Sequence, residues 1–277
     1  MVIGFLSDYG LQDEFVGVCH GVIARRCASA RVIDITHAIP RHDVRAGALA
    51  LAAALPFLPR GVALAVVDPG VGGPRRALAL ATAGSERWLL VGPDNGLLMP
   101  AAERLGGVGE AFDIGDSRER LKDVSRTFHG RDVFAPVAAA LADGAELATM
   151  GSPVEPHTLA SIELGLARVR DGVLEAHVLR VDAFGNLSLD ASASKVAELG
   201  DPGMSADGAD GAGGAVIVRA GAGAHRACRV GSFGEVREGE LLLYEDSLGT
   251  LALAVNRGSA AALLRVREGD ELRIERA

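Results

Sequence analysis

The stretch Val62-Ala-Leu-Ala-Val-Val67, followed by Asp68-Pro-Gly-Val-Gly-Gly-Pro-Arg75-Arg76, decides the fold of this 277-residue chain. A short apolar run that breaks into a Gly- and Pro-rich turn is typical of a buried parallel strand ending in a functional loop. Asp68 is therefore predicted at the carboxyl end of a strand, where open α/β sheets form their ligand crevices. The alternative is that Asp68 caps a turn and Arg75 is a solvated charge.

Similar apolar runs alternate with helical patterns on both sides of this stretch. The alternation predicts a mostly parallel sheet covered by helices, an α/β/α domain over residues 1–166. The predicted strands cover residues 2–6, 32–35, 62–67, 78–81 and 88–91, and the predicted helices cover 14–26, 44–55, 96–105 and 132–142.

After Asp171 the apolar residues recur with period two, as in Glu175-Ala-His177-Val-Leu179-Arg-Val181. This pattern predicts a second domain over residues 171–277, a small barrel or sandwich. Its further strands are predicted over 215–218, 241–244, 250–255 and 271–274, with one short helix over 192–199. The stretch Gly200–Gly214 is rich in Gly, Ala, Asp and Ser and is predicted to be a mobile surface loop.

Charge and hydropathy narrow the classes of function. The formal net charge is −8, and the only lysines are Lys122 and Lys195, which argues against a nucleic-acid partner. The longest apolar stretch, 46–58, is broken at Pro56 and is shorter than the roughly 20 residues of a membrane-spanning helix. No leader of charged, apolar and small residues opens the chain, so we expect a cytoplasmic protein that acts on a small molecule.

Common cofactor and metal motifs are missing. The Gly-rich run Gly70–Gly73 leads back into a predicted strand rather than a helix, so it is not a dinucleotide fingerprint. The sequence has neither a P-loop nor a Gly-x-Ser-x-Gly elbow. Its three cysteines show no Cys-x-x-Cys spacing, and its seven histidines show no i, i+4 pair. We therefore expect no metal and no cofactor in the reaction.

Two further loops carry groups suited to a nucleoside. Asp8 closes the first predicted strand, where a carboxylate can bind a ribose diol or can cap the following helix. Asp182, Phe184 and Asn186 surround Gly185, so that the ring can stack on adenine and the amide can pair with a base edge. The alternative for these three residues is an ordinary hairpin turn.

A last pair of segments, Ser247-Leu-Gly249 and Val255–Ala261, is interpreted as a loop-bounded strand. Asn256 and Arg257 in the second segment can bind a carboxylate or can cap the fold.

Taken in order, these segments resemble the S-adenosyl-L-methionine (SAM) hydroxide adenosyltransferase family, the SAM hydrolases that release adenosine and L-methionine. They are similar, more distantly, to the fluorinase and chlorinase enzymes. The resemblance covers nearly the whole chain. It rests on Phe5–Gly10, Asp34–His37, Val67–Gly72, Gly92–Leu98, Phe128–Asp132, Val181–Asn186 and Ala254–Gly258.

The resemblance implies a role for individual residues. The catalytic Asp, Arg and His of the family fall on Asp68, Arg75 and His129, with Arg76 as the competing arginine. The ribose-binding acid falls on Asp8, and the adenine-side residues fall on Phe184, Asn186, Ser247 and Val255. Further contacts with the substrate are predicted at His42, Asn95, Gly130, Asp182, Asn256 and Arg257, where Gly130 is expected to leave space beside His129.

The resemblance also implies an N-terminal α/β domain, a C-terminal β-barrel and a homotrimer with active sites between neighbouring subunits. The implied reaction is displacement of methionine at C5′ of SAM by water or hydroxide. Halogenating relatives carry tyrosines at the positions of Asp68 and His129 and a tryptophan at that of His42, and the extra loop of the fluorinase is absent here. A SAM-dependent halogenase and a non-catalytic adenosine- or SAM-binding module are the alternatives.

Overall fold

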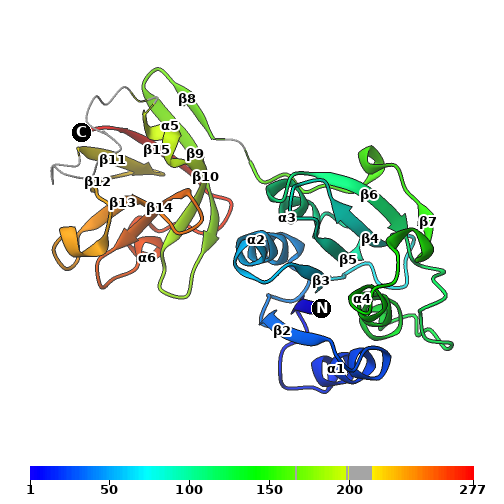
Figure 1. Ribbon diagram of the computed structural model, residues 1–277. Coiled ribbons are helices and arrows are strands. Elements are labelled where there is room, and N and C mark those ends of the chain that lie inside the picture. Colours follow the sequence, from blue (N-terminus) through cyan, green and yellow to red (C-terminus); the bar gives the residue numbers. More distant parts are fainter. Residues whose placement is uncertain (166, 198, 200–213) are drawn as a thin grey trace. The chain divides into compact units, whose positions relative to one another are not determined.

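The computed structural model describes residues 1–165, 167–197, 199 and 214–277 (Figure 1). Within them the chain divides into two compact units, Met1–Ile162 and Glu163–Ala277. The loop predicted over Gly200–Gly214 lies, except for Gly214, outside the described residues.

The first unit is built on a 7-stranded sheet with the order β2-β1-β3-β5-β4-β6-β7. Neighbouring strands pair in parallel from β2 to β5, whereas β4 and β7 run in the opposite direction to their neighbours. The predicted parallel-rich α/β class is thereby confirmed. The strands are β1 (Val2–Ser7), β2 (Arg31–Thr36), β3 (Gly61–Val66), β4 (Ala77–Thr82), β5 (Leu89–Pro93), β6 (Val108–Asp113) and β7 (Ser152–Pro153).

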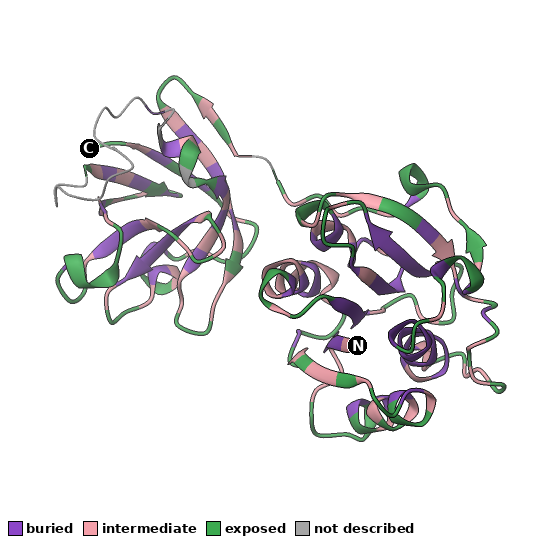
Figure 2. Cartoon of the chain, viewed as in Figure 1, coloured by how far each residue is buried: buried purple, intermediate pink, exposed green. Residues whose placement is uncertain are grey.

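Helices cover both faces of this sheet (Figure 1). Val62, Leu64 and Val66 of β3 pack in one core with α1 and α4, whereas Ala63 and Ala65 pack in a second core with α2 and α3. Because both faces of β3 are buried, its sequence is continuously apolar (Figure 2). The helices are α1 (Phe15–Arg26), α2 (Val44–Ala54), α3 (Met99–Arg104) and α4 (Ala135–Ala142), with short helices η1 (Leu55–Phe57), η2 (Gly130–Phe134), η3 (Leu147–Thr149) and η4 (Pro156–Thr158).

The second unit contains a closed barrel. Its strands follow the order β10-β14-β13-β12-β11-β15-β9-β8, and β10 also pairs with β9, which closes a ring of seven strands. The predicted C-terminal β-barrel is confirmed. The elements are β8 (Arg168–Arg170), β9 (Val173–Val181), β10 (Leu187–Ser192), α5 (Ala193–Ala197), β11 (Ala215–Ala220), β12 (Gly223–Arg229), η5 (Phe233–Glu235), β13 (Leu241–Glu245), β14 (Thr250–Val255), α6 (Ala260–Leu264) and β15 (Glu271–Arg276).

The second unit differs from the sequence prediction in its strands β8, β10 and β12, which were not predicted, and at one further segment. Val255–Ala261 was interpreted as part of a strand, but β14 ends at Val255 and α6 begins at Ala260. The Ser259 side chain accepts a hydrogen bond from the Ala262 N–H and so caps this short helix. In the first unit α3 begins at Met99 rather than at Gly96, because Gly96 has a φ of 91° and belongs to the preceding turn.

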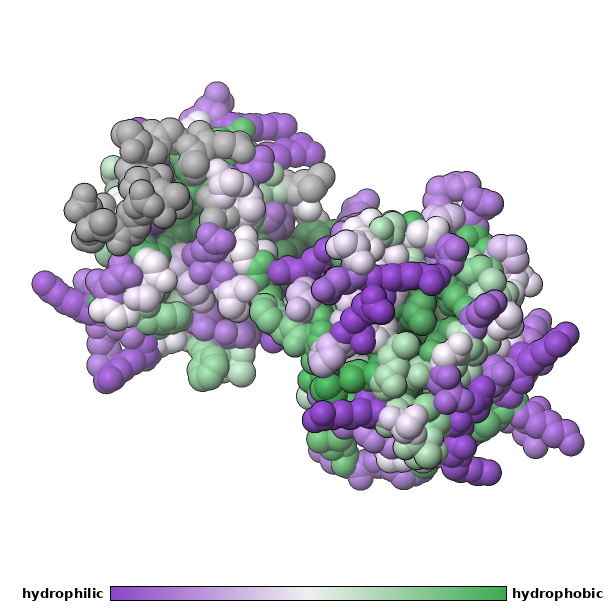
Figure 3. All heavy atoms as spheres, in the orientation of Figure 1, coloured by the Kyte–Doolittle hydropathy of each residue, from purple (hydrophilic) through white to green (hydrophobic). Residues whose placement is uncertain are grey.

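Hydrophilic side chains cover much of the visible surface of each unit and are interspersed with apolar ones (Figure 3). Within the described part of the chain, no helix combines the length and the apolar character that a membrane crossing requires.

Candidate active site

Strand ends of the first unit meet at one edge of its sheet. Ser7 of β1 lies opposite Val66 of β3 in a parallel register, so Asp8 and Asp68 both follow strands that end at this edge. Asn95, which follows β5, donates a hydrogen bond from Nδ2 to the Val67 carbonyl at 2.8 Å. Its Oδ1 accepts one from the Leu97 N–H. Asn95 therefore ties the β5 loop to the end of β3.

Asp68, Arg75 and His129 form a triad in which Arg75 lies between the other two and contacts both. Arg75 donates from Nε to Asp68 Oδ1 at 3.0 Å and from Nη2 to Asp68 Oδ2, and the same Nη2 lies 2.9 Å from His129 Nδ1. The Arg75 and Asp68 side chains are 11% and 6% exposed. The ring of Phe134 lies 5.4 Å below the guanidinium carbon. A buried, bidentate ion pair of this kind fixes the guanidinium in one orientation.

His129 precedes the π-helical turn η2 and contacts Arg75 rather than Asp68. Because a guanidinium can only donate, Nδ1 of the imidazole must accept this hydrogen bond. Burial lowers the pKa of His129 from its usual value and the Arg75 cation lowers it further, against opposing effects of Asp68 and Asp132. The imidazole is therefore neutral at pH 7. Asp68 is thus connected to His129 through Arg75.

Arg76 has a different set of partners, although it is adjacent to Arg75 in the sequence. Its Nε donates to Asp94 Oδ2 at 2.6 Å, and its Nη1 donates to the Thr158 hydroxyl at 3.0 Å. The two adjacent side chains therefore reach different partners. Arg76 thus holds the β5 loop to the segment around Thr158, and only Arg75 of the two contacts Asp68 and His129.

Tyr9 is a neighbour of this group that the sequence reasoning missed. A Cβ atom added at Gly130 would overlap the Tyr9 hydroxyl, so the space expected beside His129 is filled by this phenol. Burial raises the pKa of Tyr9 well above its usual range, and the nearby Cys19, Asp8 and Asp68 groups raise it further. Tyr9 is therefore a protonated donor next to the triad. Its signal in the sequence was its place directly after Asp8.

Asp8 accepts a hydrogen bond through Oδ2 from the backbone N–H of His42 at 2.9 Å. His42 has a φ of 66° and an exposed side chain, so its backbone conformation presents the N–H to the carboxylate. Asp8 does not cap α1, since the residue preceding that helix is Glu14 and forms no capping bond. The structure thus joins Asp8, the predicted ribose-binding acid, to His42, a further predicted substrate contact.

In the second unit, Asp182, Phe184 and Asn186 form the turn between β9 and β10. Asp182 accepts hydrogen bonds from the backbone N–H groups of Phe184 and Asn186 and from the Asn186 side chain, each at 2.9 Å. The carboxylate therefore organises the turn. The Phe184 ring is 80% exposed, so one aromatic face is available for stacking.

The remaining predicted residues lie around β14. Val255 ends this strand and is buried, and Asn256 donates from Nδ2 to the Val236 carbonyl at 2.8 Å. Arg257 is exposed and lies 3.3 Å from Glu238. Ser247 belongs to the turn that begins β14, so it lies at the opposite end of that strand from Val255.

Two family models match this chain. The model described as the SAM hydroxide adenosyltransferase N-terminal domain matches residues 3–151, and that described as the C-terminal domain matches residues 176–273. A protein named (R)-S-adenosyl-L-methionine hydrolase from Salinispora tropica is 50% identical over 272 residues, which are 98% of this chain and 97% of that protein.

Two further comparisons place this similarity in a wider group. The crystal structure of an uncharacterized conserved protein from Thermotoga maritima is similar with a TM-score of 0.89 and 39% identity, covering 99% of this chain and 100% of that one. A fluorinase from Actinoplanes sp. is more distant, with 28% identity over 209 residues, 67% of this chain and 70% of that protein.

Proposed function

The chain belongs to the SAM hydroxide adenosyltransferase family, and from this premise we propose that it hydrolyses SAM to adenosine and L-methionine. The observation that carries the proposal is the contact of Arg75 with both Asp68 and His129 at the strand edge. These residue types are those that can bind a water molecule and make it a nucleophile.

In the proposed reaction an oxygen nucleophile attacks C5′ of SAM opposite the sulfonium. The new C5′–O bond forms while the C5′–S bond breaks, and its electron pair stays on sulfur, so that methionine leaves as a neutral thioether. The leaving group needs no acid because the sulfonium already carries a positive charge. The chemical difficulty is therefore the nucleophile, since hydroxide is scarce at neutral pH.

Asp68, Arg75 and His129 together generate the nucleophile from water, each in a different role. The Arg75 cation favours the ionised form of a nearby water molecule, and neutral His129 accepts its proton. Nδ1 is the unprotonated atom of the imidazole, so it gives up its hydrogen bond from Arg75 Nη2 as it takes the proton of the water, while Asp68 keeps the guanidinium in place. Asp68 positions Arg75. An exchange of the proton-accepting role between Asp68 and His129 is the alternative.

The remaining predicted residues bind the substrate. Asp8, held by His42, accepts hydrogen bonds from the ribose diol, and Asn95 fixes the adjacent loop. Phe184 stacks on adenine beside Asn186 in the turn that Asp182 organises, with Ser247 and Val255 as further adenine contacts. Asn256 and Arg257 face the methionine carboxylate. Tyr9 and Gly130 complete the wall next to His129.

The proposal is tested by incubating the purified protein with SAM and separating the nucleosides by chromatography. Adenosine and L-methionine are expected in equal amounts, with a rate unchanged by a chelator. Accumulation of methylthioadenosine, or of a 5′-halogenated nucleoside in halide buffer, would indicate another reaction. Tight binding of SAM without turnover would favour the non-catalytic module.

The pH dependence follows from the lowered pKa of His129. We expect kcat/KM to be constant around neutrality and to fall only at a pH below the usual titration range of histidine, since protonation of the imidazole removes the proton acceptor. This decrease of kcat/KM at low pH should be absent from the residual activity of a His129→Gln protein. If the same decrease persists in that variant, a group other than His129 accepts the proton.

We further propose that the protein is a cytoplasmic homotrimer whose sites combine residues of two subunits. The proposal is supported by the family and by the ribose and adenine candidates lying in different units. Asp8→Ala and Asn186→Ala proteins, each impaired alone, should regain part of the wild-type rate when mixed under subunit exchange. A fully active monomer in light scattering would contradict this arrangement.

A further inference from the structure

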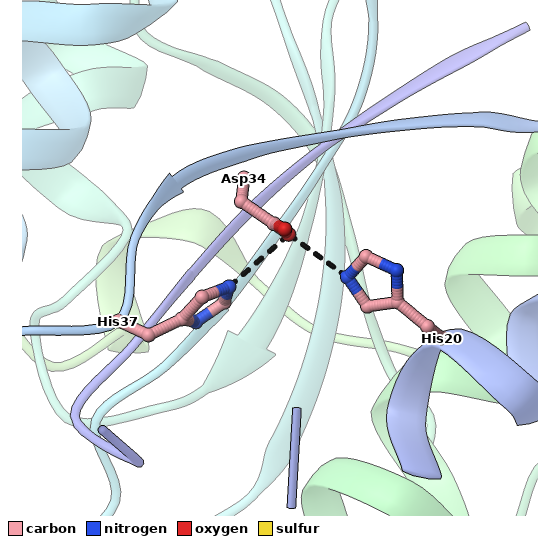
Figure 4. A group of neighbouring side chains, drawn as sticks. All are labelled: His20, Asp34 and His37. Carbon is pink, nitrogen blue, oxygen red and sulfur yellow. Dashed lines mark hydrogen bonds and ion pairs between the residues drawn. The ribbon is translucent and has the colours of Figure 1, made fainter. Parts of the chain in front are cut away.

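Two histidines of the first unit converge on one carboxylate away from Asp68, Arg75 and His129 (Figure 4). His20 lies on α1, Asp34 lies on β2, and His37 follows the end of β2. Nε2 of His20 lies 2.9 Å from Asp34 Oδ1, and Nε2 of His37 lies 3.1 Å from the same oxygen. All three donor atoms lie within 4.8 Å of one another. Among the described residues this is the group of three side chains that could hold a metal ion.

The spacing of these atoms is close to what a metal site needs. Tetrahedral coordination with bonds of about 2.0–2.1 Å places neighbouring donor atoms roughly 3.3 Å apart. The two nitrogen–oxygen separations are already slightly shorter than that. Bringing the two nitrogens to this distance requires a movement of the partly exposed His20 ring, whose side chain is 36% exposed.

The imidazole of His37 gives a second, independent indication. Its side chain is 2% exposed, and its Nε2 has no hydrogen-bond partner despite the nearby Asp34 oxygen. A buried polar atom without such a partner costs free energy, and this one points at the other two donors (Figure 4). A metal ion between the three groups would satisfy it.

The outer contacts of His37 are those of a metal-ligating histidine. Its Nδ1 lies 2.7 Å from the buried hydroxyl of Ser7, which fixes the ring and leaves Nε2 as the coordinating atom. The ring of Phe5, also buried, meets the His37 ring edge to face at 4.6 Å. An outer hydrogen bond together with an apolar neighbour is the usual surrounding of a ligating imidazole.

We propose that His20, Asp34 and His37 bind a first-row divalent metal ion, with Zn²⁺ as the best match. Imidazole nitrogens suit Zn²⁺, whereas Mg²⁺ and Ca²⁺ prefer oxygen donors. Three protein ligands leave a fourth position for water, and Asp34, 44% exposed, leaves the site open to it. The ion would join α1 to β2. Through the contact of His37 with Ser7 it would also be connected to the end of β1, directly before Asp8. The site stabilises the first unit and takes no part in the hydrolysis, so it stands independently of the proposed function.

The test uses metal-free, untagged full-length protein and calorimetric titration with Zn²⁺, with Mg²⁺ in a parallel experiment. One equivalent of Zn²⁺ should bind at this site, and His20→Ala should weaken its binding by at least about tenfold, as even loss of an outer-shell partner typically does. Ser7→Ala should weaken it by roughly 10–100-fold. Mg²⁺ should not bind there.

His177→Ala is the matched control. His177 forms a hydrogen bond of 2.9 Å with Asp190 and is 38% exposed, so it resembles His20, but no second histidine belongs to that group in the described part of the chain. Its removal should leave Zn²⁺ binding unchanged. Far-UV circular dichroism verifies that each variant is folded.

Co²⁺ supplies a second readout. Visible absorption bands of a four-coordinate ion are expected in wild type and in His177→Ala, and their loss is expected in His20→Ala. Absence of Zn²⁺ binding in the wild type would overturn the proposal. So would wild-type affinity in a folded His20→Ala protein, which would assign the bound ion to another place.

Discussion

Arg75→Ala is expected to lower kcat by roughly 10²–10⁴-fold, the range for electrostatic and proton-transfer groups. Arg75 is the member of the triad that contacts both others, so its removal leaves Asp68 without its cation and His129 without its donor. Asp68→Asn and His129→Ala should each have an effect in the same range. Initial rates of adenosine formation from SAM measure all three.

The combined variants sharpen this prediction. Because the three groups act on one water molecule, the double and triple variants should be little slower than the slowest single variant. Adenosine should still bind to each, since its proposed contacts lie elsewhere. Rate losses that multiply would show that the residues act separately.

Arg76→Ala is the matched control for Arg75→Ala. Arg76 hydrogen-bonds to Asp94, whose side chain is 6% exposed, and to Thr158. Its loss should therefore lower the free energy of unfolding of the first unit, because a buried carboxylate loses its partner, while kcat at a temperature where the protein is folded stays close to wild type. An inactive Arg76→Ala protein beside a fully active Arg75→Ala protein would contradict the assignment.

Water, rather than halide, is expected as the nucleophile even at high chloride or fluoride concentration. The carboxylate of Asp68 repels a halide, which must enter the site as an anion, whereas water enters as a neutral molecule and loses its proton to His129 only there. The space next to Gly130 is also filled, by Tyr9. Chromatography should therefore detect adenosine and neither 5′-chloro- nor 5′-fluoro-5′-deoxyadenosine. Halogenated nucleoside formed at a rate comparable with adenosine would make the protein a halogenase.

The double variant Asp68→Tyr with His129→Tyr tests the same point from the other direction. It removes the carboxylate and the proton acceptor together and leaves Arg75 as an unpaired cation. Hydrolysis should fall by at least the roughly 10²–10⁴-fold of the single variants, while traces of chloride transfer become detectable. Retained hydrolysis would show that neither group activates water.

Much of the fold could be predicted because the informative patterns are local. The apolar run of β3 is continuous since both of its faces are buried, and it marks its own end at Asp68. Strand β6 was missed because Gly109 and Glu110, its two exposed residues, interrupt its apolar residues. The helix α6 was missed because it has only five residues, too few for a helical period to show.

The candidate site could be predicted in its members but not in its contacts. Residues at the ends of neighbouring parallel strands, such as Asp8 and Asp68, follow from the α/β pattern. The choice between Arg75 and Arg76 does not, because both have the same chemistry and differ only in the direction of their side chains. The contacts of Tyr9 with Gly130 and of His20 with Asp34 join segments far apart in the sequence, so no spacing rule brings them together.

The central claim is that a water oxygen replaces sulfur at C5′, and isotope labelling measures it most directly. Wild-type protein is incubated with SAM in heavy-oxygen water, and the nucleoside and methionine are analysed by mass spectrometry. We expect the label in the 5′-hydroxyl of adenosine and none in methionine. Label in methionine, or adenosine without label, would contradict displacement at C5′ by water.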